Sequence, residues 1–113
     1  MKLAIINSKG RWPSKIFLES YEREGIDYDF ANNFEGFEKN YPDVQDYSGV
    51  LIHPPLGQHK SWLEKAQKRF PNTRLAFASR YLGSTLQKMN VTENIPLLDF
   101  DEVDEIKKYF EGR

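Results

Sequence analysis

The sequence predicts an α/β protein with three layers, in which a five-stranded parallel sheet of order 2-1-3-4-5 lies between helices. Two observations support this class. Five short apolar runs alternate with five stretches that have helical spacing or helix-capping residues, which is the pattern of parallel strands joined by right-handed crossovers. Three runs are continuously apolar, as strands covered on both faces are, whereas the second and fifth carry acidic residues or a proline and suit sheet edges.

The first half of the chain contains two of the predicted strands and two of the helices. Residues 3–6 form a buried strand, and residues 13–25, which begin with proline and end with glycine, form a helix. Residues 26–30 alternate strictly between apolar and acidic side chains, so we expect one buried and one wet face. A second helix over residues 34–41 is ended by a proline. Its candidate caps are Asn32 and Asn33, and its apolar stripe consists of Phe34, Phe37 and Tyr41.

The second half begins with the apolar run at residues 50–52, followed by a stiff loop that contains two prolines. A helix is expected over residues 61–70, and residues 75–78 form the next buried strand. A short fourth helix is expected over residues 81–89. The inward positions of the 61–70 helix are Trp62, Leu63, Ala66 and Phe70.

The last strand and helix are predicted from a proline and a cap. Residues 95–98 contain Pro96, which lacks a ladder donor and belongs at a sheet edge. Asp101 is the expected cap of the fifth helix, with Asp104 at its third position, where a negative charge suits the helix dipole. The residues expected to face the sheet are Val103, Ile106, Tyr109 and Phe110.

Composition limits the function classes. With 113 residues the chain is expected to form one domain, 1–113. A net charge of -1 gives no electrostatic support for a nucleic acid or an acidic membrane as partner. The absence of cysteine excludes disulfides and thiolate metal sites. The apolar N-terminal run is too short for a signal sequence or a membrane span, so a cytoplasmic location is expected.

The carboxyl edge of the predicted sheet collects the residues that are candidates for chemistry. In open α/β sheets, ligands bind in the crevice outside the carboxyl ends of the strands, at the point where the strand order reverses. For order 2-1-3-4-5 this point lies between the first and third strands. The residues expected around it are Asn7, Ser8, His53, Ser79 and Asp99.

The five-fold alternation, the chain length, the prolines after the third strand and the hydroxyl after the fourth resemble the receiver domains of bacterial response regulators, across the whole chain. Receivers carry an acidic pair after strand one, a phospho-accepting aspartate ending strand three, a Ser or Thr ending strand four and a lysine ending strand five. The corresponding positions are Asn7 and Ser8, His53, Ser79 and Asp99. Only Ser79 keeps the residue type of the family.

The resemblance implies a degenerate pseudo-receiver, a stand-alone signalling domain that acts by protein–protein interaction. Aspartyl phosphorylation needs a carboxylate nucleophile and a magnesium ion with hard oxygen ligands. Neither requirement is met at Asn7, Ser8 and His53, so we expect no phosphoryl transfer, no enzyme activity, no cofactor and no metal. In receivers, the face formed by the fourth helix, fifth strand and fifth helix binds partners or a second copy. This resemblance directs attention to Tyr81, Leu82 and Tyr109, and to a possible homodimer.

Other functions remain open. A small-ligand or anion site at the carboxyl edge would add three cations: Lys9, Arg11 and Arg80. A Ser79-His53-Asp99 hydrolase is the less favoured alternative, because the sequence lacks the glycines of a nucleophile elbow and Ser79 is explained as a helix cap. A flavodoxin-type flavin site shares the sheet order but needs a Ser/Thr-rich phosphate loop, which is missing. His53 and His59 could form a metal pair, but no placed carboxylates accompany them. A hydrogen-bonded histidine at the core margin is the simpler explanation of His53, at the end of its strand, and its pKa range still permits pH sensing.

Overall fold

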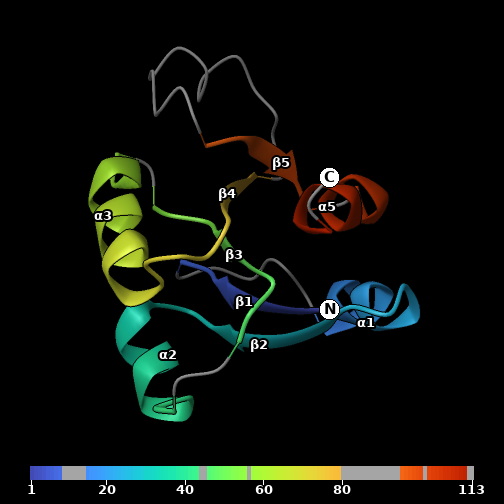
Figure 1. Cartoon of the computed structure of the whole chain (residues 1–113), viewed down its shortest axis with the longest axis horizontal. Helices are drawn as coiled ribbons and strands as arrows, with labels where there is room; N and C mark the ends of the chain where they lie inside the picture. The colour runs from blue at the N-terminus through green and yellow to red at the C-terminus, as the bar shows by residue number, and fades with distance from the viewer. Residues whose placement is uncertain (9–14, 44–45, 56, 80–94, 101, 112–113) are drawn as a thin grey trace.

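The computed structural model describes residues 1–8, 15–43, 46–55, 57–79, 95–100 and 102–111. It contains one five-stranded, all-parallel sheet of order β2-β1-β3-β4-β5 with helices on both faces (Figure 1). This is the flavodoxin-like α/β arrangement, and the predicted fold class and strand order are confirmed. No helix in the described ranges has the length and apolarity needed to cross a membrane.

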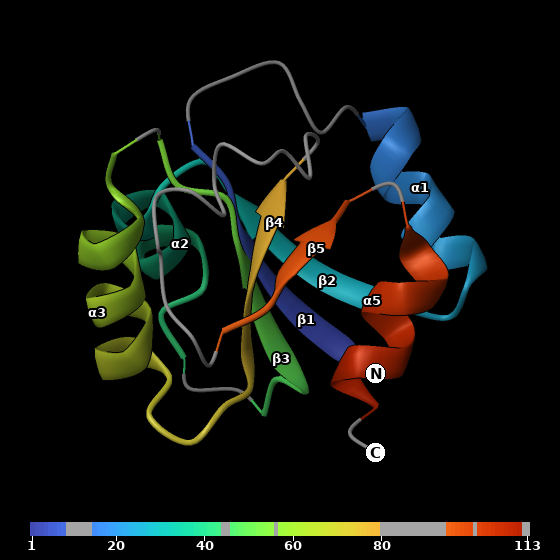
Figure 2. The same cartoon turned by 90° about the horizontal axis from the view of Figure 1, so that it is seen from above.

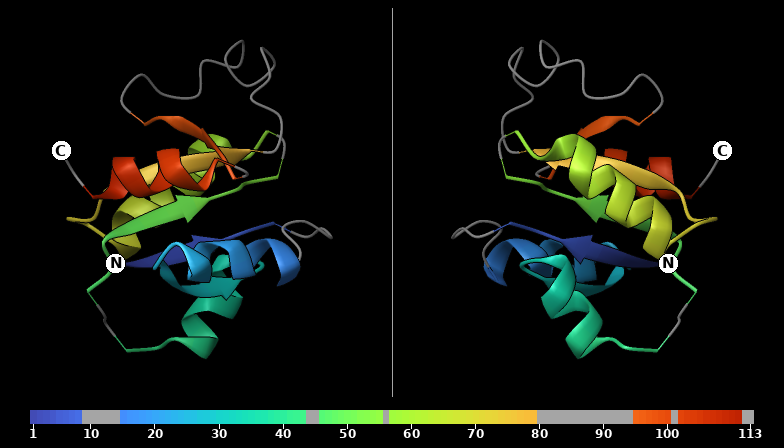
Figure 3. Two further views of the ribbon diagram at one scale, coloured as in Figure 1. Left: turned by 90° about the vertical axis from the view of Figure 1, so that its right-hand side faces the viewer. Right: turned by 90° about the vertical axis from the view of Figure 1, so that its left-hand side faces the viewer.

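Four strands match the predicted runs to within one residue at each end, whereas β5 begins at Leu97 and not at Ile95, so Pro96 lies directly before the strand and not within it. Their bounds are β1 Lys2–Ile6, β2 Asp27–Ala31, β3 Gly49–Ile52, β4 Leu75–Ser79 and β5 Leu97–Asp99. Figure 3 shows them stacked in spatial order, from the orange β5 through β4, β3 and β1 to β2. The central strands β1 and β3 are almost completely buried, as continuously apolar runs require. The strands with acidic residues or an adjacent proline lie at the two edges.

The helices divide into two pairs. Their bounds are α1 Lys15–Arg23, α2 Phe34–Asn40, α3 His59–Arg69 and α5 Val103–Phe110. In Figure 2, α2 and α3 cover one face of the sheet, and α1 and α5 cover the other. The helix expected over residues 81–89 lies outside the described residues. Asn33 caps α2, since its side-chain oxygen accepts a hydrogen bond from the Gly36 amide, which confirms one of the two predicted caps.

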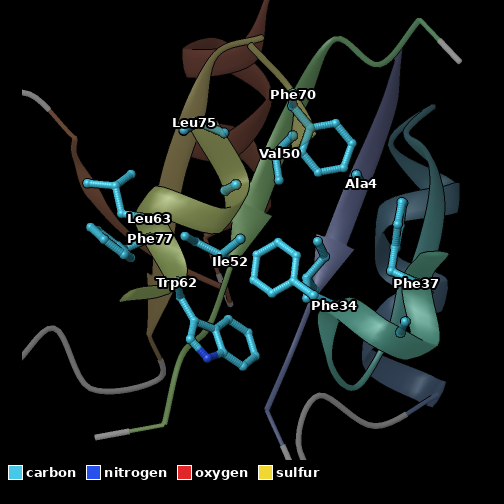
Figure 4. Close-up of a cluster of buried hydrophobic side chains, with 13 residues drawn as sticks. Ala4, Phe34, Phe37, Val50, Ile52, Trp62, Leu63, Phe70, Leu75 and Phe77 are labelled. Atoms are coloured by element: carbon cyan, nitrogen blue, oxygen red, sulfur yellow. The ribbon is translucent and has the colours of Figure 1, made fainter. Parts of the chain in front are cut away.

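The core beneath α2 and α3 is rich in aromatic side chains. Figure 4 shows these rings over the sheet, together with branched aliphatic residues from β3 and β4. The Phe37 ring contacts those of Tyr41, Tyr47 and Phe70 at centroid distances of 5.0, 5.9 and 5.8 Å. Phe34 meets Trp62 edge-on at 5.1 Å. These offset and edge-on arrangements are the favourable ones for aromatic pairs.

The core beneath α1 and α5 is mainly aliphatic and is crossed by hydrogen bonds between distant residues. The buried Tyr21 hydroxyl of α1 donates to the Phe100 carbonyl at 3.0 Å. On α5, the Tyr109 hydroxyl donates to the Leu75 carbonyl at 2.9 Å. A side-chain carbon at Gly49 would overlap the Phe110 ring, so glycine is what allows α5 to approach β3. The fully buried apolar residues include Leu3, Ile5, Ile26, Leu51, Phe100 and Ile106.

Besides the start of β5, three local predictions were wrong. The third helix begins at His59 and not at Ser61, because Gly57, at φ +86°, turns the chain early and Trp62 already donates to the Gln58 carbonyl. The cap of α5 is Glu102 and not Asp101, so Asp104 is the second helical residue. The Glu102 amide donates to the Asp99 carbonyl at 3.0 Å, which closes the turn directly after β5.

The third error concerns the edge strand β2. The acidic face was expected to be wet, yet Asp29 is half-buried. Its carboxylate lies 3.2 Å from the Lys2 ammonium and accepts a hydrogen bond from the Tyr47 hydroxyl at 2.6 Å. These two partners compensate the carboxylate for the water it loses. The apolar residues Tyr28 and Phe30 are likewise half-buried, so the strand has no fully buried face.

Candidate functional site

The carboxyl edge of the sheet is built by four strand ends. Ile6 of β1 and Ile52 of β3 lie in register, so the next residues, Asn7 and His53, are neighbours. Ser79 and Asp99 are paired in register at the ends of β4 and β5. The expected residues therefore share this edge, at the reversal in strand order between β1 and β3.

Asn7 and His53 form a direct side-chain pair. The imidazole Nδ1 lies 2.7 Å from the Asn7 Oδ1. Because an amide oxygen only accepts hydrogen bonds, Nδ1 is the donor and neutral His53 carries its proton there. The backbone holds both residues, since the Asn7 amide donates to the Ala31 carbonyl at 2.8 Å and the His53 amide to the Ile6 carbonyl at 2.9 Å. Asn7 is buried, with 1% of its surface exposed.

Two further residues, Phe100 and His59, belong to the surroundings of this pair in the described part of the chain. The His53 ring meets the buried Phe100 ring edge-on at 5.8 Å. His59, the first residue of α3, is buried against Phe77 at 5.3 Å, and its Nδ1 has no hydrogen-bond partner in the described part of the chain. Phe100 was not singled out from the sequence. The predicted last strand ends at residue 98, which places Phe100 in the following loop, so no sequence signal marked it.

Both imidazoles are held in the neutral form. Burial lowers the pKa of His53, and the nearby His59 charge lowers it further. Burial also lowers the pKa of His59. Removal from water disfavours the charged imidazolium, and this is the larger cause of the lowered pKa in both residues. At neutral pH, the carboxyl ends of β1 and β3 therefore carry the Asn7 amide and the uncharged His53 imidazole.

The remaining predicted residues are less directly placed. Ser8 is half-buried and follows Asn7. Tyr109 is half-buried on α5, where it is engaged in the hydrogen bond to Leu75 and its carbonyl accepts from Arg74 at 2.7 Å. Five predicted residues lie outside the described ranges: Lys9, Arg11, Arg80, Tyr81 and Leu82.

The donor set at this edge limits its chemistry. An amide and a neutral imidazole at the ends of β1 and β3 supply neither a carboxylate nucleophile nor the hard ligands that magnesium prefers. Within the described ranges, no group of three or more metal-ligating side chains is assembled. A serine hydrolase would need a carboxylate on His53 Nδ1, and that nitrogen is bonded to an amide.

Comparison with known proteins adds no family to this description. No protein-family model matches the chain, and the search of curated proteins returned no match. The fold and the site geometry therefore define the class: a flavodoxin-like α/β domain with a polar, uncharged pair at the reversal point of its sheet.

Proposed function

We propose that this protein is a receiver-like regulatory domain that acts by binding another protein and does not accept a phosphoryl group. The observation that carries the proposal is the Asn7–His53 hydrogen bond of 2.7 Å. It occupies the two strand ends at which the resemblance places metal ligands and a phospho-accepting carboxylate. Burial of Asn7 and of the Phe100 ring beside His53 gives this pair a structural, conformation-fixing role.

Phosphoryl transfer is tested directly with a small phosphodonor. The purified chain is incubated with acetyl phosphate and magnesium, and its intact mass is measured, with an active receiver domain as positive control. We expect no added phosphoryl group, because the edge lacks a nucleophilic carboxylate at β3. A single added phosphoryl mass that disappears in the Asp99→Asn variant would overturn the proposal.

Partner binding is tested in the host. The tagged chain is recovered under gentle conditions, and any co-purified protein is produced separately and titrated against the chain. We expect saturable binding that an Asn7→Ala/His53→Ala variant weakens, because loss of this pair loosens the ends of β1 and β3. Recovery of no such partner, together with a strong metabolite response in the screen below, would reverse the ranking.

A small-ligand or anion site at the same edge is the second candidate. The observation that favours it is the N-terminal end of α3, where the Gln58 side chain makes no capping hydrogen bond and His59 stands near His53. Uncapped helix amides attract anions. A thermal-shift screen with nucleotides and phosphorylated metabolites tests this candidate, since a ligand that binds only the folded chain raises its melting temperature.

A further inference from the structure

A groove separates the two helices on one face of the sheet. It lies between α2 and α3, which stand side by side in Figures 1 and 2, and its volume is about 460 Å³. The residues that line it are Phe34, Glu35, Glu38, Lys65, Lys68 and Arg69. The residues from α2 are an aromatic ring and two acids, and those from α3 are three bases. The groove therefore has one acidic edge and one basic edge.

The spacing within each edge keeps the charges in line. Glu35 and Glu38 are three residues apart on α2, and Lys65 and Lys68 are three residues apart on α3, so each pair projects from one side of its helix. All four side chains are exposed. None of them forms an ion pair with another residue that the structure describes. The two charged edges line the same space, and no ion pair among the described residues joins them.

Arg69 is fixed in place at the basic edge. Its Nη2 donates to the Tyr41 carbonyl at 3.3 Å, and its guanidinium lies 5.8 Å from the centroid of the Phe70 ring. Its Nε is buried without a hydrogen-bond partner among the described residues. A guanidinium has five N–H donors, so Arg69 keeps donors for a further acceptor without having to order a free side chain.

A surface with these two edges is complementary to itself. A two-fold axis that runs along the groove exchanges the two sides of the groove in the second copy. The acidic edge of the second copy then lies over the basic edge of the first, and its basic edge lies over the acidic edge of the first. An axis across the groove would place like charges together. Homodimers with two-fold symmetry use the same patch on both subunits, and this patch satisfies that condition in one orientation.

We propose that the α2–α3 groove is the contact surface of a homodimer, with Glu35 and Glu38 of each copy facing Lys65, Lys68 and Arg69 of the other. This proposal does not rest on the proposed regulatory function. The Phe34 ring is only 8% exposed, so the contact gains little apolar area and depends on charge. Such a dimer is weak and sensitive to salt. A basic or acidic partner protein would satisfy only one edge of the groove.

The first test is the molar mass of the full chain, followed by sedimentation equilibrium over a range of concentrations. We expect a reversible monomer–dimer equilibrium at an ionic strength of about 0.01 M, where the Debye length is about 30 Å, and monomer at about 1 M, where it is about 3 Å. A chain that remains monomeric at every concentration at low salt would overturn the proposal, and so would a dimer that does not respond to salt.

Charge reversal then locates the interface. Glu35→Lys/Glu38→Lys makes both edges basic, and Lys65→Glu/Lys68→Glu makes the α3 edge mainly acidic. Each variant alone is expected to associate at least about tenfold more weakly than the wild-type chain, because like charges now face each other. Mixing the two variants brings opposite edges together and is expected to restore association, now between unlike chains.

The control is Lys107→Glu/Lys108→Glu on α5, on the opposite face of the sheet. It changes the net charge of the chain by the same amount as Lys65→Glu/Lys68→Glu does. We expect its dimerisation to match that of the wild-type chain. Circular dichroism checks that every variant is folded. Dimerisation that survives both groove variants, or that the α5 variant abolishes, would place the interface elsewhere and contradict the proposal.

Discussion

On the α2/α3 face of the sheet, aromatic rings contact one another directly, whereas on the α1/α5 face distant residues are joined by hydrogen bonds over a mainly aliphatic layer. The first face is stabilised by ring shape and area. The second combines an aliphatic layer with a few points of close approach, such as Gly49 beneath Phe110 and the Tyr21–Phe100 contact. The same sheet thus has one face held mainly by contacts between large rings and one that adds long-range polar contacts to smaller side chains.

The largest expected effect is on the aromatic face. Phe37→Ala removes a ring that is 1% exposed and contacts three other rings, and it leaves a cavity. We expect the free energy of unfolding to fall by about 3–5 kcal/mol in urea denaturation. Phe37→Leu is the control, because it keeps part of the volume and loses the ring contacts. A small, equal loss in both variants would show that ring geometry matters little on this face.

The second prediction tests the closest approach on the other face. Gly49→Ala places a methyl group where the Phe110 ring lies, so α5 must shift. We expect a loss of about 1–3 kcal/mol in the free energy of unfolding. Adding Phe110→Leu makes room and should recover part of that loss, which a double-mutant cycle measures. Additive losses in the cycle would mean that these two residues do not compete for the same space.

A smaller effect is expected when the hydroxyl of Tyr21 is removed. Tyr21→Phe keeps the buried ring and deletes the donor to the Phe100 carbonyl, with an expected loss of about 1 kcal/mol. Tyr28→Phe is the matched control, because its hydroxyl bonds to Glu22 at an exposed site, where changes stay within about 0.5 kcal/mol. Equal losses in the two variants would contradict the role of the buried hydrogen bond.

The smallest effect on the free energy of unfolding at neutral pH is expected from replacing the two imidazoles. One of them lies beside each core. His53 contacts Phe100 of the α1/α5 core, and His59 contacts Phe77 of the α2/α3 core. The pKa values of both residues lie below the ordinary value of 6.5, chiefly because of burial. The unfolded chain therefore binds protons first as the pH falls. The stability from the neutral imidazoles is complete above about pH 6.5 and is lost as the pH falls through the lower folded pKa values.

Denaturation curves between about pH 7 and about pH 5 measure this dependence. His53→Gln and His59→Gln should each flatten it. His59→Gln should also raise the pKa of His53, measured by NMR titration, because a neighbouring positive charge is removed. An unchanged slope in both variants would contradict the buried, neutral state of these residues.

The sheet order was predictable because composition identifies the strands that cannot be covered on both faces. Asp27 and Asp29 exclude β2 from the centre, and Pro96 places β5 at an edge. The partners of Asp29 were not predictable, since Lys2 and Tyr47 lie on other segments and only the folded chain brings them together. Local sequence patterns predict which strands are buried. They do not predict which distant polar groups will pair with a charged side chain that loses contact with water.

The candidate site was predictable to the same extent: the positions of its residues follow from the strand order, but the contacts between their side chains do not. Strand order alone brings Asn7 and His53 to adjacent strand ends, and the structure adds the hydrogen bond between them. The burial of His59 was not predicted, because the predicted helix begins at Ser61 and leaves His59 in the preceding loop. The turn at Gly57 begins α3 two residues earlier and carries His59 into the core.

The acidic edge strand β2 has one more consequence, for aggregation. Exposed sheet edges offer unpaired backbone groups to other chains, and natural proteins protect them with charges, prolines or short strands. Asp27 and Asp29 place negative charge along β2, while β5 has only three residues and follows Pro96 directly. Both ends of the sheet therefore resist the addition of strands from neighbouring molecules.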